Sequence, residues 1–195
     1  VTAIDKVCEQ TGEKEINAVG YCLGGTLPGT TAAYLAAKKD KRLASVTFFT
    51  TMLDFSIPGE LGVFIDEQQV ANLEEKMRSR GYLEGSEMAS TFNMLRANDL
   101  IWQYVVGNYL KGDKPAPFDL LYWNSDSTNL PGPFAAWYLR HLYLENSLRV
   151  PDKLEMCGVK ADLGKVDMPH FILATREDLI VPWQSSYLGR RHLGG

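Results

Sequence analysis

Apolar residues follow two different spacings along the chain, and these spacings divide it into three parts. Short apolar runs typical of buried strands lie at residues 16–19, 44–53 and 169–175. Between the second and third runs, apolar residues recur at helical spacing and are interrupted by proline and glycine. We therefore expect a mixed α/β fold. Residues 1–55 and 157–195 would form its core, and residues 56–156 a mainly helical, cap-like insertion.

Helix boundaries are marked by glycine, proline and capping residues. Gly12 is expected to end an N-terminal helix, and Gly81 to end a helix that begins at a capping box at Asp66. Further helices are expected over 88–95, 99–109 and 134–145, and Pro182 should begin the last one. Pro28 is unusual, because it lies beyond the first turn of the helix that follows residue 22 and should kink it.

The strand at residues 16–19 leads into Gly20-Tyr21-Cys22-Leu23-Gly24-Gly25 and then into a helix. This pattern predicts a nucleophile elbow with sulfur in place of oxygen. Gly20 and Gly24 would avoid a clash at the sharp turn. The amide of Leu23 would face a developing oxyanion, and the positive end of the helix would favour a thiolate. The alternative is that Cys22 is a small buried apolar residue.

The same glycine cluster does not match two other glycine-rich loops. A dinucleotide-binding loop needs glycine where Cys22 stands, and a phosphate loop needs a Gly-Lys-Ser/Thr sequence that is missing here. The elbow therefore remains the functional interpretation.

Three carboxylates compete for the role of catalytic acid. Asp178 follows the apolar run at 169–175, which is where the acid of an α/β hydrolase lies, and the adjacent Glu177 has nearly the same position. Asp178 could also cap the helix that begins at Pro182. Asp54 follows the strand at 44–53, and a cap or turn is the favoured interpretation there.

Composition limits the class of protein. The 195 residues include 45% hydrophobic and 23% charged residues, with a net charge of −4. These values are ordinary for one soluble domain, and the negative charge argues against a nucleic-acid partner. No apolar run approaches the length of a membrane span. Three widely spaced cysteines predict neither a disulfide framework nor a metal site, and they fit a reducing cytoplasm. Arg140 and His141 could meet an anionic ligand, although a solvated helix face is the simpler interpretation.

The chain begins at Val1, in a segment that already has a helical pattern. The parallel strands that precede the nucleophile in an α/β hydrolase are missing. We therefore expect a piece of a longer protein that contains the second half of an α/β-hydrolase sheet.

Several further motifs occur together with the elbow. They are Leu53–Phe55, Arg96–Trp102, Asn108–Gly112, Phe118–Asn124, Asn129–Pro133, Cys157–Val159 and Arg176–Trp183. With these motifs and with Cys22 in its elbow, the chain resembles the class I poly(3-hydroxyalkanoate) synthases, whose lipase-like box carries cysteine.

The resemblance implies that Cys22 carries the acyl group and that Asp178 is the catalytic aspartate. It implies an acyltransferase that polymerises (R)-3-hydroxyacyl-CoA, especially short-chain thioesters such as 3-hydroxybutyryl-CoA, with CoA release and no cofactor or metal. It also implies a homodimer on the surface of cytoplasmic polyester granules, where granule-associated proteins are further partners.

Two departures from the family pattern concern histidine. The family's catalytic histidine lies in a Gly-His motif further downstream. His192 lacks the preceding glycine and lies too early, so the chain by itself should be inactive. Leu179 stands where the family usually has histidine. The alternatives are a cysteine-dependent hydrolase or polyester depolymerase on the same fold, and an inactive granule-associated relative.

Overall fold

A computed structural model describes residues 1–115, 120 and 126–195, so most of the Phe118–Asn124 motif lies outside the described residues. The described residues form two compact units. The first combines Val1–Ile65 with Leu139–Gly195, and the second is Asp66–Tyr138. The insertion expected over 56–156 is thus wider than the second unit, because residues 56–65 and 139–156 pack with the first unit.

The first unit contains a parallel three-stranded sheet in the order β1-β2-β7. Its strands are β1 (Ile16–Tyr21), β2 (Leu43–Phe49) and β7 (His170–Leu173). The central strand β2 carries the buried core residues Val46 and Phe48. Strand β2 ends at Phe49, before the expected residue 53, because Thr50 adopts a positive φ of 41° that an extended strand cannot contain.

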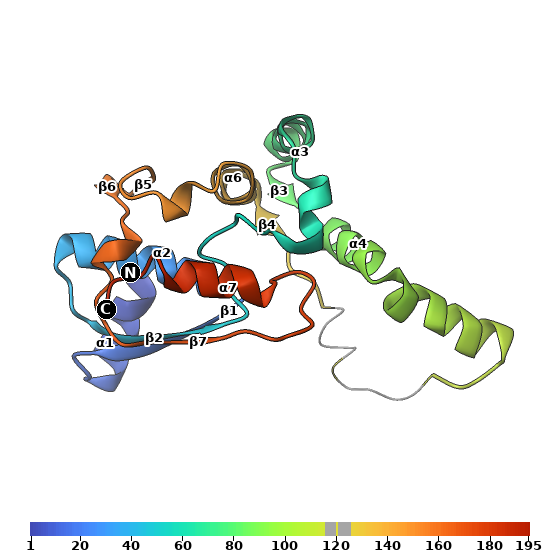
Figure 1. Cartoon of the computed structure of the whole chain (residues 1–195), viewed down its shortest axis with the longest axis horizontal. Helices are drawn as coiled ribbons and strands as arrows, with labels where there is room; N and C mark the ends of the chain where they lie inside the picture. The colour runs from blue at the N-terminus through green and yellow to red at the C-terminus, as the bar shows by residue number, and fades with distance from the viewer. Residues whose placement is uncertain (116–119, 121–125) are drawn as a thin grey trace. The chain divides into compact units, whose positions relative to one another are not determined.

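Two helices of this unit, α2 (Leu23–Lys38) and α7 (Trp183–Arg190), lie on the same side of the sheet (Figure 1). Helix α2 buries a stripe of small and branched residues that includes Ala32, Ala33 and Leu35. It is continuous from Leu23 to Lys38, although Pro28 lies inside it. The predicted helix after the elbow is therefore confirmed, and the proline does not divide it.

The N-terminal helix α1 (Thr2–Thr11) ends at Gly12, whose φ of 75° is the left-handed conformation that glycine adopts most readily. This confirms the predicted helix end. The rest of the first unit consists of short elements. They are the 3-10 turns Gly59–Phe64, Ser147–Arg149 and Leu163–Lys165, the π-helical turn Leu139–Leu144, and the antiparallel pair β5 (Glu155–Met156) and β6 (Val159–Lys160).

The second unit is mainly helical. Helix α3 (Glu67–Arg80) begins at Asp66, whose side chain accepts a hydrogen bond from the Gln69 amide at 2.8 Å, and it ends at Gly81 with φ 87°. Both boundaries were predicted. The other elements are α4 (Gly85–Leu95), the π-helical turns Asn98–Trp102 and Val105–Leu110, α6 (Gly132–Tyr138) and the antiparallel pair β3 (Tyr82–Leu83) and β4 (Leu130–Pro131).

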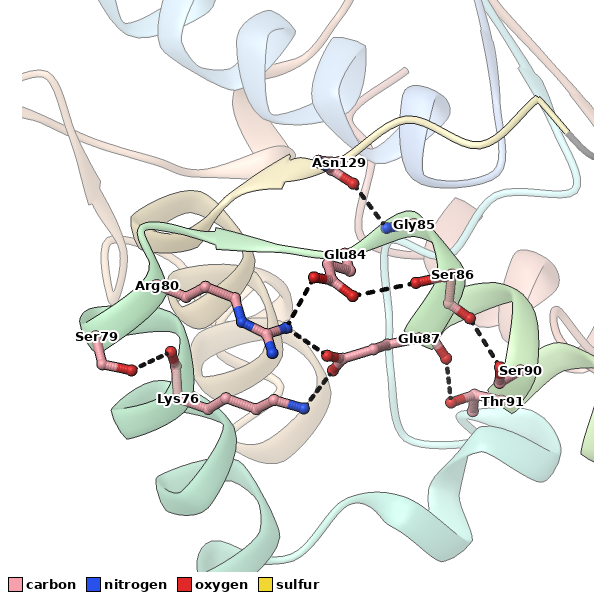
Figure 2. A network of polar contacts seen from close by, with 10 residues as sticks. All are labelled: Lys76, Ser79, Arg80, Glu84, Gly85, Ser86, Glu87, Ser90, Thr91 and Asn129. Atoms are coloured by element: carbon pink, nitrogen blue, oxygen red, sulfur yellow. Dashed lines mark hydrogen bonds and ion pairs between the residues drawn. The ribbon is translucent and has the colours of Figure 1, made fainter.

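A network of polar contacts joins α3 to the start of α4 within the second unit (Figure 2). Glu87 accepts hydrogen bonds from Lys76 at 2.7 Å and from Arg80 at 2.6 Å, and Arg80 also pairs with Glu84 at 3.3 Å. The Asn129 side chain accepts from the Gly85 amide at 3.0 Å. Because these ion pairs are exposed to solvent, each adds little to the stability of this unit. Among the described residues, no helix is both long and apolar enough to cross a membrane.

Candidate active site

Cys22 lies on a sharp turn between β1 and α2, as the sequence predicts. Its φ of 53° and ψ of −123° are unusual for a residue with a side chain. Its amide donates to Phe49 O at 2.9 Å, and its carbonyl accepts from the amides of Gly25 and Thr26 at 2.8 and 3.2 Å. Backbone strain of this kind persists where the surrounding structure holds the residue in place, which is common at functional sites.

Two glycines make the close approach of this turn possible. A Cβ atom on Gly20 would lie 2.5 Å from the Cα of Gly25, and a Cβ on Gly25 would overlap the side chain of Thr51. A Cβ on Gly24 would have nothing within 4 Å. The prediction that Gly20 and Gly24 prevent a clash is therefore correct for Gly20 and wrong for Gly24. The glycine that faces the segment after β2 is Gly25, the third residue of α2.

The environment of the Cys22 thiol acts on its pKa in two directions. Burial raises the pKa, a hydrogen bond from the Leu23 amide opposes this effect, and the negative charge of Asp178 raises the pKa further. The Leu23 amide therefore lies close to the sulfur, and its role as an oxyanion donor stays a prediction. Because the pKa is raised, the thiol form dominates at neutral pH, and nucleophilic attack needs a base.

Asp178 lies on the turn that follows β7, at the end of the parallel sheet where β1 leads into Cys22. Its Oδ1 accepts hydrogen bonds from the amides of Ile180 and Val181, both at 2.9 Å. Helix α7 begins at Pro182 without a side-chain cap, so Asp178 holds a turn and does not cap that helix. Glu177 is exposed, whereas Asp178 is half-buried and acts on the Cys22 thiol. The structure thus favours Asp178 over Glu177.

Asp54 is a buried carboxylate with partners from distant parts of the chain. It accepts hydrogen bonds from the Ser56 amide and hydroxyl, from Asn146 Nδ2 at 2.8 Å and from His192 Nε2 at 2.7 Å. Burial raises its pKa, but the bonds from Ser56, Asn146 and His192 outweigh burial and lower the pKa to about 2. Asp54 forms the predicted turn with Ser56. The contacts with Asn146 and His192 had no signal in the sequence, because 92 and 138 residues separate the partners.

The three histidines of the chain have partners away from Cys22. His192 contacts Asp54, His141 Nδ1 lies 3.0 Å from Glu145 Oε2, and His170 Nδ1 lies 3.3 Å from Met168 O. The contact with Glu145 gives His141 a role within its own helix. No anion-binding role is needed to explain it.

A family model described as "alpha/beta hydrolase fold" matches residues 1–194. The chain belongs to the alpha/beta hydrolase fold family. This membership confirms the fold class predicted from the elbow, and it explains why a strand, a sharp turn and a helix place Cys22 at the edge of a parallel sheet.

Relatives within the family carry a more specific name. The chain is 52% identical to a poly(3-hydroxyalkanoate) polymerase subunit PhaC of Rhizobium meliloti, over 99% of this chain and 31% of the relative. It is 51% identical to the same subunit of Cupriavidus necator, over 96% of this chain and 33% of the relative. It is also 51% identical to a poly(3-hydroxyalkanoate) polymerase of Methylorubrum extorquens, over 100% of this chain and 32% of the relative. These matches confirm the resemblance that the motifs indicate, and the chain spans about a third of the length of these relatives.

Proposed function

We propose that the protein containing these residues polymerises (R)-3-hydroxyacyl-CoA into polyhydroxyalkanoate through a covalent thioester on Cys22. The observation that carries the proposal is the Cys22 elbow itself, with its φ of 53°, its Leu23 amide and the nearby charge of Asp178. Identities of 51–52% to proteins named poly(3-hydroxyalkanoate) polymerases support the same conclusion.

In the first step, the Cys22 sulfur attacks the thioester carbonyl of the acyl-CoA. The amide of Leu23 is placed to donate to the oxyanion of the tetrahedral intermediate. The bond between the carbonyl carbon and the CoA sulfur then breaks, and CoA leaves with a proton. One thioester replaces another, so the acyl group remains activated, whereas an ester on an oxygen nucleophile would lose much of this activation.

In the second step, the 3-hydroxyl oxygen of another hydroxyacyl group attacks the acyl carbon on Cys22. A new ester bond forms, the Cys22 sulfur departs, and the hydroxyl proton passes to a base. Asp178 supports this base or accepts the proton itself. Water competes with the hydroxyl group, so polymer forms only when water is excluded from the thioester.

The raised pKa of Cys22 also bears on the base. A thiol that is mostly protonated at neutral pH reacts slowly unless a base removes its proton during attack. Since none of the contacts described for His141, His170 and His192 involves Cys22, we infer that another histidine of the full-length protein acts on Cys22. The product is an insoluble polyester, which agrees with action at a granule surface.

The test uses the full-length protein and (R)-3-hydroxybutyryl-CoA. Free CoA and solvent-extractable polyester are measured for the wild type, for Cys22→Ala and for the matched control Cys8→Ala, which removes a partly exposed thiol on α1. We expect CoA and polymer from the wild type and from Cys8→Ala, and neither from Cys22→Ala. Mass spectrometry of the acid-quenched wild type should find the hydroxybutyryl adduct on the peptide that contains Cys22.

Each alternative has its own result in this experiment. CoA release that yields only free 3-hydroxybutyrate would identify a hydrolase, because water would then be the acyl acceptor. No release that depends on Cys22 would contradict the synthase proposal and favour an inactive relative.

A further inference from the structure

Residues 49–60, which we call the support segment, contact the backbone of Cys22 and of Leu179, the residue that follows Asp178. Near its start, Phe49 O accepts a hydrogen bond from the Cys22 amide at 2.9 Å. At its end, the Glu60 amide donates to the carbonyl of Leu179, the residue after Asp178, at 2.9 Å. The relative placement of Cys22 and Asp178 therefore depends on the conformation of this segment.

The support segment is packed tightly against the elbow helix α2. The Thr26 hydroxyl donates to Met52 O at 2.8 Å, and a Cβ on Gly29 would lie 2.5 Å from Leu53 Cδ2. Such close packing transmits a shift of the segment directly to the helix that carries Cys22. Thr50 has a φ of 41°, so part of the segment is strained and must be held by its surroundings.

Helix α7 also contacts the support segment. The Ser186 hydroxyl donates to Thr51 O at 3.1 Å, and the Ser185 hydroxyl donates to Ile57 O. Both serines are buried. Since α7 begins shortly after the turn of Asp178, these bonds give the segment a second connection to the acid.

Asp54 lies in the middle of the support segment and joins it to two distant parts of the chain. Its side chain is buried, and an ionised carboxylate only accepts hydrogen bonds, so the Nε2–H of His192 is the donor at 2.7 Å. Asn146 donates to Asp54 and also accepts from the Phe55 amide at 2.8 Å. Arg149 donates to the Ser56 hydroxyl, which itself donates to Asp54.

We propose that Asp54 is a positioning residue that fixes the support segment and, through it, the relative placement of Cys22 and Asp178. Asp54 itself does not contact the reacting atoms. Its effect on turnover rests on the proposed function, but its effect on the reactivity of Cys22 does not.

The test compares Asp54→Asn with Asp162→Asn in the full-length protein. Asp162 is a matched control, because its carboxylate also accepts from an amide two residues later, that of Gly164 at 2.9 Å, yet it lies outside the support segment. Per folded molecule, Asp54→Asn should lower kcat by about tenfold or more with KM changed less, since small misplacements of reacting groups are costly. The pH profile of Cys22 alkylation by iodoacetamide should also shift. Asp162→Asn should change neither.

A second pair of variants covers the case in which Asp54→Asn does not fold. His192→Leu removes one donor to Asp54 and should reproduce part of both effects, whereas His192→Gln retains an N–H donor and should restore them. Alkylation profiles and kcat values of Asp54→Asn and His192→Leu that match Asp162→Asn would overturn the proposal. If the wild type makes no polymer, the proposed function fails, and the alkylation profiles still decide the role of Asp54.

Discussion

Replacing Asp54 by asparagine should reduce the stability of the first unit by an amount that depends on pH. The pKa of this buried carboxyl falls from 3.8 to about 2, because the hydrogen bonds from Ser56, Asn146 and His192 outweigh the cost of burial. At about 1.4 kcal/mol per pKa unit, the ionised carboxylate contributes about 2 kcal/mol to the free energy of unfolding at pH 7. The isosteric Asp54→Asn substitution removes this contribution.

The sign of the pH dependence follows from proton binding. The pKa is lower in the folded than in the unfolded state, so the unfolded state binds more protons between about pH 4 and pH 2. The contribution of Asp54 is therefore complete well above pH 4, about half remains at pH 3, and it is lost as the pH falls through 2. Asp54→Asn has no group that titrates at this position.

The assay is urea unfolding of the full-length wild type and of Asp54→Asn at pH 7 and pH 3. The difference in the free energy of unfolding should be about 2 kcal/mol at pH 7 and about half as large at pH 3. An equal difference at both pH values would refute the assignment of the stabilisation to the ionised carboxylate.

Two further predictions concern the elbow and its charge. Gly25→Ala should lower the free energy of unfolding by about 2 kcal/mol or more, because the new Cβ overlaps Thr51. Gly24→Ala should change the free energy of unfolding by less than about 1 kcal/mol, because its new Cβ has nothing within 4 Å. Thermal unfolding of both variants would test this, and equal losses of stability would contradict the packing argument. Asp178→Asn should lower the pKa of Cys22 and speed its alkylation at pH 7 while it reduces turnover, because it removes a negative charge near the thiol. The matched control Glu177→Gln should alkylate at the wild-type rate, and an unchanged rate in Asp178→Asn would show that this carboxylate does not act on Cys22.

The sequence predicted those features that depend on local chemistry. The sharp turn at Cys22, the helix end at Gly12 and the capped start of α3 at Asp66 each follow from residues within one or two turns of each other. The position of Asp178 after β7 follows from the order of strands and turns along the chain. Local patterns of this kind are the ones that a single sequence reveals best.

Features that depend on distant contacts were not predicted. The bonds of Asp54 with Asn146 and His192 span 92 and 138 residues, and the contact of Gly25 with Thr51 follows from how α2 packs against the segment after β2. The expected boundary at residue 56 also differs from the unit boundary at Ile65, since composition cannot show which core a loop packs against. Helix α2 continues past Pro28, although proline lacks the amide that donates a hydrogen bond inside a helix.

The backbone conformation of Cys22 makes this residue a poor choice for stability. A φ of 53° is easier for glycine than for any residue with a side chain, so Cys22→Gly would relieve strain in the turn. Selection for stability alone would therefore favour glycine at this position, and selection for the chemistry of sulfur retains cysteine. A chain released from that selection should lose its cysteine early and keep its fold. Cysteine at position 22 therefore indicates that selection still maintains the activity.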